Sequence, residues 1–134
     1  MDSPPRKPAR LRFRLLDERF AICKLAATDP APAWATEAVF ASITRTPEEL
    51  SIVCPLKQVP APHRPELPWF CLKLEGPFAF SEVGILKAFI DPLVKNGIPI
   101  FVVSTYDTDY VLVQETFSPA ALKALEQAGH ELIE

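Results

Sequence analysis

Two acids and three aliphatic hydroxyls stand together between two apolar runs in the C-terminal third of the sequence. Residues 98–103 form the first apolar run and residues 110–113 form the second. Two carboxylates this close could act as a general acid/base pair. No nucleophile motif, metal-binding motif or glycine-rich phosphate loop accompanies them, so we expect no catalytic residues, no cofactor and no enzymatic activity. The polar segment consists of Ser104, Thr105, Tyr106, Asp107, Thr108 and Asp109.

This polar segment contains neither glycine nor proline, although tight hairpins usually place glycine or Asn-Gly at the corner. Two interpretations stay open. Asp107 and Thr108 can form the turn, because their side chains bond their own backbone. Asp109 can be an ordinary exposed acid at a hairpin end, and Tyr106 can be surface packing. Alternatively, the side chains serve to bind something.

The elements around the segment follow from hydrophobic periodicity. Residues 69–76 and 98–103 predict strands, and residues 110–115 predict the returning strand. Between the first two strands, apolar residues recur at helical spacing from Leu86 to Val94, after Ser81 as the helix cap and before an Asn-Gly end. Pro92 inside this helix predicts a kink or an early end. Ser118-Pro119 begins a second helix, Gly129 ends it, and residues 130–134 form a last strand. The order β-α-β-β-α-β is the ferredoxin-like arrangement.

The first half of the chain repeats this order loosely. Residues 44–53 align with residues 104–113 at an offset of 104 − 44 = 60, which superposes hydroxyls, acids and apolar positions. FAICKL at 20–25 resembles WFCLKL at 69–74, each with a cysteine and a Lys-Leu pair. Residues 29–39 are too short and too rich in proline for a long helix. We therefore expect a duplicated unit whose first copy is degenerate.

Proline marks the boundary between the two copies. The chain has 15 prolines, and five of them fall between Pro55 and Pro68. Such a stretch is neither a helix interior nor a central strand, so it predicts an extended connector near residues 56–67.

Residues 78–114 resemble the ACT domain, most of all the ACT domains of aspartate kinases and of the eukaryotic arginine sensors of the TOR pathway. The resemblance is carried by a short loop into a helix start with glycine, an Asn-Gly break, and a strand that ends in Ser-Thr-x-x-x-Asp. It implies an α+β protein with two ferredoxin-like βαββαβ ACT units in tandem, the first degenerate, with antiparallel sheets and helices on one face. We expect a flexible tail at 1–10, the degenerate unit at 11–60 and the ACT domain at 61–134.

The resemblance further implies a stand-alone regulatory module that binds a free amino acid at a dimer or inter-ACT interface. A helix N-terminus favours a ligand carboxylate, and an acid or hydroxyl at the strand end can take the α-ammonium group or a basic side chain. Ser81 and Glu82 would also suit any first helical turn without a ligand. The predicted cradle for the carboxylate consists of Phe80, Ser81, Glu82, Val83 and Gly84, and residues 104–109 form the opposite wall.

The ligand and the partners remain open at this point. The acids favour a cationic amino acid such as arginine or lysine, but they also suit any α-ammonium group. A homodimer would supply the number of ACT units found in the arginine sensors, and a separate regulated protein would receive the signal. The alternative is a protein-interaction or structural module without ligand binding, which the degenerate first copy and the connector favour.

Composition limits the other classes of partner. The 134 residues carry a net charge of −3, which argues against a nucleic-acid partner, although five basic residues lie between Arg6 and Arg14. Three separated cysteines and two distant histidines predict no metal site and suit a reducing compartment. No run is long enough to span a membrane, and the first ten residues lack the apolar core of a signal peptide. We therefore expect a cytoplasmic protein.

Overall fold

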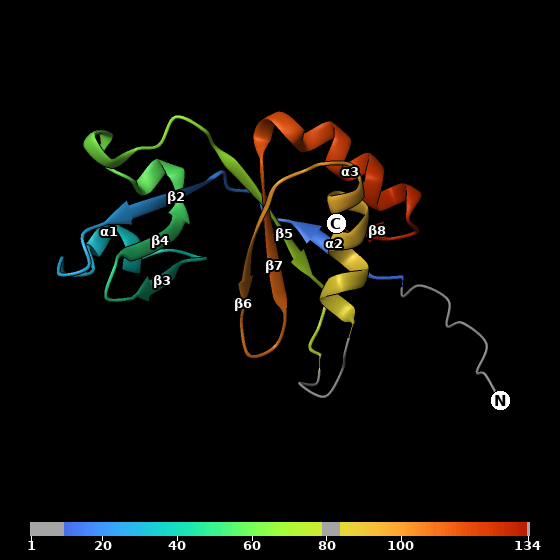
Figure 1. The fold of residues 1–134 in the computed structure, drawn as a ribbon, viewed down its shortest axis with the longest axis horizontal. Helices are drawn as coiled ribbons and strands as arrows, with labels where there is room; N and C mark the ends of the chain where they lie inside the picture. The colour runs from blue at the N-terminus through green and yellow to red at the C-terminus, as the bar shows by residue number, and fades with distance from the viewer. Residues whose placement is uncertain (1–9, 79–83, 134) are drawn as a thin grey trace.

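The computed structural model describes residues 10–78 and 84–133 of the 134-residue chain. It is a mixed α+β protein in which all eight strands join one sheet (Figure 1). The strands are β1 (Arg12–Leu15), β2 (Phe20–Leu25), β3 (Ser42–Arg45), β4 (Leu50–Pro55), β5 (Trp69–Leu74), β6 (Ile100–Ser104), β7 (Asp109–Gln114) and β8 (Glu131–Leu132). The α-helices are α1 (Ala33–Thr36), α2 (Ile85–Lys95) and α3 (Ser118–Gln127), and short 3-10 turns are η1 (Leu56–Gln58), η2 (Ala61–His63) and η3 (Glu115–Phe117).

One continuous sheet replaces the separate antiparallel sheets expected from the sequence. Its C-terminal part has the strand order β6-β7-β5-β1-β8, and its N-terminal part has the order β3-β4-β2. The two parts join where Phe20 of β2 pairs with Trp69 of β5. All pairs are antiparallel except β1 with β8, which is parallel.

Strand β1 pairs with two strands that lie far from it in the sequence. The expected division assigned residues 11–60 to the first unit, but β1 pairs with β5 and β8 of the C-terminal part. Alternation explains the fit, because Phe13 is buried against the helices whereas Arg12 and Arg14 reach Glu131 and Glu75. The N-terminal part therefore lies, in sequence, between two strands of the C-terminal sheet.

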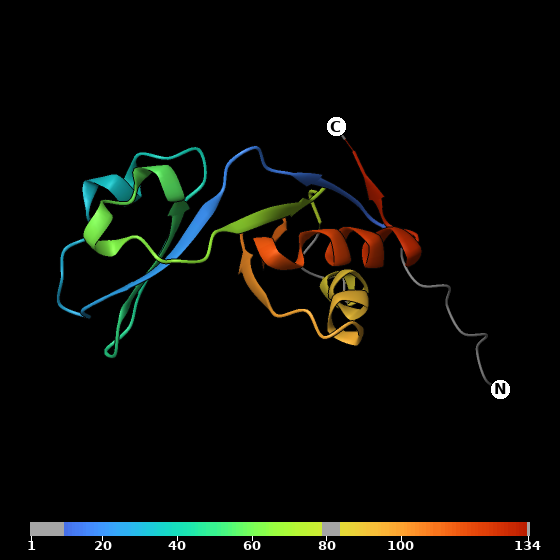
Figure 2. The same cartoon turned by 90° about the horizontal axis from the view of Figure 1, so that it is seen from above.

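Helices α2 and α3 cover one face of the C-terminal sheet, as Figure 2 shows from above. Their apolar residues pack on alternate residues of β5 and β7, because side chains of a strand point in turn to opposite faces. The core of this part contains Phe13, Phe70, Leu72, Leu74, Phe89, Leu93, Val111, Val113 and Leu125. Burial of these side chains fixes the distance of α2 from the sheet, and α2 carries one wall of the site described below.

The same three-strand pattern occurs twice in the chain. Arg45 pairs with Leu50 as Ser104 pairs with Asp109, so the offset between these hairpins is 104 − 45 = 59. The pairing of Phe20 with Pro55 corresponds to that of Trp69 with Gln114. The offset is again 114 − 55 = 59 for the hairpin strand, and it is 69 − 20 = 49 between β2 and β5. The offset of 60 read from the sequence is thus one residue too large. A slip of one residue exchanges the two faces of a strand, so it matters for every comparison of side chains.

The helix boundaries differ from the sequence expectation in three places. Helix α2 begins at Ile85 with Gly84 as its cap residue, and Ser81 lies outside the described residues. Pro92 neither ends nor shortens α2, which continues to Lys95. Ser118 is the first residue of α3 rather than its cap, a position that Phe117 occupies.

Candidate functional site

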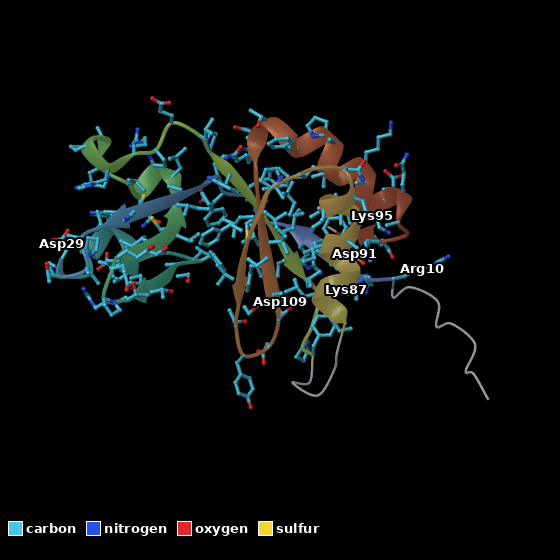
Figure 3. All side chains as sticks on the ribbon, in the orientation of Figure 1. Arg10, Asp29, Lys87, Asp91, Lys95 and Asp109 are labelled. Carbon is cyan, nitrogen blue, oxygen red and sulfur yellow. The ribbon has the colours of Figure 1, made fainter. Side chains whose placement is uncertain are left out.

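A pocket of about 310 Å³ opens between the start of α2 and the corner that joins β6 to β7. Figure 3 shows Lys87 on α2 and Asp109 on the hairpin at this end of the sheet. Pockets for small molecules usually begin at about this volume, so the site suits a small ligand. The lining consists of Phe78, Gly84, Ile85, Leu86, Lys87, Ser104, Thr105, Tyr106, Asp107, Thr108 and Asp109.

One wall of the pocket is the N-terminal turn of α2. Gly84 has φ 83°, a left-handed conformation that glycine adopts without the cost borne by other residues. The first bond within the helix runs from the Ala88 N–H to the Gly84 carbonyl at 2.9 Å. The amides of residues 85–87, which precede Ala88, therefore have no partner inside the helix, and they carry the positive end of its dipole. This wall favours an anionic group.

The opposite wall is a turn that its own hydroxyls stabilise. The Thr105 N–H donates to the Thr108 carbonyl at 2.8 Å, and the Thr105 hydroxyl donates to the same carbonyl at 3.1 Å. The buried Thr108 hydroxyl donates to the Leu74 carbonyl of β5 at 2.8 Å. These bonds replace the glycine that such a corner usually needs. Thr105 and Thr108 thus have a structural role whether or not a ligand binds.

The two acids of the corner differ in their surroundings. Asp109 accepts a hydrogen bond from the Ser104 hydroxyl, its partner across the hairpin. The Asp107 side chain is exposed, while its backbone carbonyl accepts from the Phe78 N–H at 2.8 Å. This second bond ties the corner to the segment that leaves β5. Both carboxylates border the pocket and make its corner wall acidic.

Lys87 is the cation in the pocket lining, and its charge is already paired. Its Nζ lies 2.7 Å from Asp91 one turn further along α2. A pair of this kind between exposed side chains contributes little to stability. Because Lys87 pairs with Asp91, it does not pair with Asp107 or Asp109 at the corner, and these two carboxylates can bind a positively charged group.

The structure brings part of the predicted ligand-binding residues together, and their role in binding stays a prediction. Gly84 and residues 104–109 meet in one pocket, as the site prediction required for contact between the helix start and the strand end. Phe80, Ser81, Glu82 and Val83 lie outside the described residues. The prediction omitted Phe78, Ile85, Leu86 and Lys87, which line the pocket because α2 begins later than expected. Gly84 was the available signal, since glycine at a helix end often marks the boundary.

Elsewhere, the described residues offer little for catalysis or metal binding. Burial raises the pKa of Cys71 to about 12, and burial with the nearby Cys23 raises that of Cys54 to about 11. Such thiols stay protonated and unreactive at neutral pH. No group of three or more His, Cys, Asp or Glu residues within 10–78 and 84–133 could hold a metal ion. None of the helices in these ranges is long and apolar enough to cross a membrane.

Comparison with known proteins agrees with this fold. Residues 65–127 match the family model described as ACT domain, and residues 18–62 match a second model described as an N-terminal domain. The chain is 44% identical to a protein of Agobacterium tumefaciens whose crystal structure has a TM-score of 0.86, with 93% of each chain covered. The chain belongs to the ACT domain family, whose members are in general regulatory modules for small ligands.

More distant structures share the fold alone. A protein of unknown function from Vibrio cholerae, described as a possible transport protein, is 23% identical over 89% of this chain and 90% of its own, with a TM-score of 0.69. A structure of aspartokinase alpha and beta subunits is 15% identical over 90% of this chain and 98% of its own, with a TM-score of 0.57. Both matches extend over the N-terminal and C-terminal parts together.

Proposed function

We propose that this protein is a regulatory module that binds a free amino acid in the pocket between α2 and the β6–β7 corner. One observation carries the proposal: the N-terminal turn of α2, which carries the positive end of the helix dipole, and the two acids of the corner line the same pocket of about 310 Å³. An amino acid is a zwitterion whose two charges are opposite and close together. The helix amides would bind its carboxylate, and Asp107 or Asp109 would bind its α-ammonium group.

The apolar part of the lining limits the side chain of the ligand. Phe78, Ile85 and Leu86 border the pocket beside the charged walls, so a side chain with an aliphatic stem would pack against them. A cationic amino acid such as arginine or lysine has such a stem, and its second positive charge could use the remaining carboxylate. Any other α-ammonium group would use only one of the two acids.

We further propose that the N-terminal part is a degenerate ACT unit without a ligand site. The repeated strand register supports common ancestry of the two parts. The helix that corresponds to α2 is the four-residue α1, which is too short to offer a comparable N-terminus. A homodimer that closes the open side of the pocket, and a separate protein that receives the signal, complete the proposal.

The first experiment is a thermal-shift screen of the full chain against each of the twenty amino acids at millimolar concentration. A ligand at a hundredfold excess over its dissociation constant stabilises the native state by about 2.7 kcal/mol, which raises Tm by several degrees in a domain of this size. At least one of Asp107→Asn and Asp109→Asn should lower the affinity for the responding amino acid by roughly tenfold or more, because it removes a charge-assisted bond, and both should do so if the ligand is cationic.

Glu48→Gln provides a matched control. At the offset of 59 residues, Glu48 corresponds to Asp107 (48 + 59 = 107), and it is an exposed acid in the equivalent turn of the first hairpin. This variant should respond to the ligand as the unaltered protein does. A panel without any response, or a response that both Asp variants leave intact, would contradict the proposal and favour an interaction module with a purely structural corner.

A further inference from the structure

A third core cluster lies where the two parts of the molecule meet. It is formed by the face of the C-terminal sheet that α2 and α3 leave uncovered, together with the facing side chains of β2 and β4. Its fully buried members are Phe20, Val53, Cys71 and Leu112, and Val103 and Tyr110 of the β6–β7 hairpin pack against them. The hairpin therefore takes part in the contact between the two parts.

The same hairpin forms the corner of the pocket. Val103 pairs with Tyr110, and the next pair along the hairpin is Ser104 with Asp109. The first pair packs in the cluster between the two parts, and the second lines the pocket. The two contacts are therefore adjacent in one rigid two-stranded element, so a shift of either pair also displaces the other.

Phe40 is the side chain through which the segment between α1 and β3 reaches this hairpin. Its ring centroid lies 4.5 Å from that of Tyr110 and 5.5 Å from that of Phe20. Its neighbour Val39 is 99% exposed, whereas Phe40 is half-buried against these two rings. Aromatic contacts of this kind contribute beyond the area that they bury.

A second cavity borders the hairpin on the side of the N-terminal part. It has a volume of about 220 Å³, and it separates β6 from the hydroxyl-bearing face of β3 and β4. Ser42, Thr44 and Ser51 line it on one side, and Ser104 lines it on the other. Ser104 thus borders both this cavity and the proposed ligand pocket.

We infer that the β6–β7 hairpin links the pocket to the N-terminal part, so that a change at residues 104–109 alters the order of the Phe40 segment, and the reverse. Its role in signalling rests on the proposed function, whereas the link itself does not. Coupling between two sites is reciprocal, so it can be measured from either end. Burial first, then Cys71 and Asp107, raise the pKa of Tyr110 above its ordinary value, so the corner acid and this tyrosine lie close enough to interact electrostatically.

Amide hydrogen exchange on the full chain tests the link without any ligand. Phe40→Ala should speed the exchange of the Thr105 amide by roughly tenfold, because local opening of the corner becomes easier. Val39→Ala, one residue away and fully exposed, should leave it unchanged. The buried Leu11 amide, bonded to His130 Nδ1 at 3.0 Å, reports global destabilisation, and the change at Thr105 should exceed the change at Leu11. Phe40→Leu, which keeps most of the volume, serves if Phe40→Ala does not fold.

The reverse measurement uses the corner as the altered site. Asp107→Asn should change the exchange of amides in the segment 37–41, and Glu48→Gln should not. Equal Thr105 exchange in the Phe40 and Val39 variants would overturn the link, whatever the ligand screen shows. Ligand binding is tested separately with a mixture of the twenty amino acids, each at millimolar concentration. No thermal shift with that mixture would contradict the proposed function, but it would not affect a positive result from hydrogen exchange.

Discussion

His130 supplies the hydrogen bond that Pro92 withholds. In α2 the N–H of residue 92 would donate to the Ala88 carbonyl, but proline has no N–H. His130 Nε2 lies 3.0 Å from that carbonyl, and its Nδ1 accepts from the Leu11 N–H at 3.0 Å. A backbone N–H only donates and a carbonyl only accepts, so the ring is neutral with its proton on Nε2. The buried imidazole therefore joins β1 to α2 and explains why the helix continues through Pro92.

Replacement of His130 should destabilise the protein. His130→Leu removes the partner of the buried Leu11 N–H, at a cost of about 1–3 kcal/mol, and that of the part-buried Ala88 carbonyl, at a smaller cost. The amide of His130→Gln offers an NH2 donor and an oxygen acceptor, so it should recover part of the loss. Urea unfolding gives the free energies. The cost of His130→Leu should be smaller in a Pro92→Ala background, because an alanine N–H at 92 can serve Ala88. Equal costs in the two backgrounds would contradict the pairing.

Thr108→Val should destabilise the corner and the protein together. The variant keeps the shape of the side chain but removes the donor to the Leu74 carbonyl, at a cost of about 1–3 kcal/mol. Thr108→Ser keeps the hydroxyl and is the matched control, with a smaller cost from the lost methyl group. Thermal unfolding separates the two. The assignment of a structural role to Thr108 would be wrong if serine were the worse replacement.

Gly76→Ala should move the corner. A Cβ at this position would lie 3.0 Å from the Asp107 carbonyl oxygen and 3.2 Å from both the Phe78 nitrogen and the Thr108 Cβ. The backbone around residue 76 therefore has to shift, and the hydrogen bond from the Phe78 N–H to the Asp107 carbonyl has to shift with it. Overpacking of this kind costs about 1–3 kcal/mol. Backbone amide shifts in an NMR spectrum should change across 104–109. Gly84→Ala is the comparison, since its Cβ would meet nothing within 4 Å and the strain comes from φ alone.

Alkaline pH should weaken the fold through its buried thiols. Burial raises the pKa of Cys71 from 9.0 to about 12, so the folded state favours the neutral thiol more than the unfolded state does. That stabilisation is complete below pH 9 and is lost as pH rises from 9 through the folded value. One such group changes the unfolding free energy by on the order of 1 kcal/mol per pH unit. Urea midpoints from pH 8 to 11, under reducing conditions, should fall less steeply for Cys71→Ala.

The C-terminal elements could be predicted because their signals are local. The apolar face of α2 and the strands on either side of the corner follow the periodicity of their own residues. The helix start was misplaced because Ser81 and Gly84 both offer end signals, and the tertiary context decides between them. The continuation of α2 through Pro92 could not be read locally, because its cause is His130, in a different element.

The position of β1 was out of reach for a related reason. Four residues with alternating polarity predict a strand, but they do not name its neighbours. The bond between Leu11 and His130 spans 119 residues, and no local pattern encodes it. The internal repeat was detectable by residue type, yet its offset was wrong by one, because the hydroxyls and acids of the two turns match equally well in either alignment. Strand register, which depends on burial, removed the ambiguity.

The pairing of β1 with β8 brings the first and last strands of the chain together, with Arg12 opposite Glu131. Joining the ends by a short linker and opening the chain in the connector between β4 and β5 would give a circular permutant. In that permutant β5 through β8 would be followed directly by β1, and each part of the sheet would come from one uninterrupted stretch of sequence. In the natural order, by contrast, β1 is made before the whole N-terminal part, and it finds its partners β5 and β8 only after that part has been made.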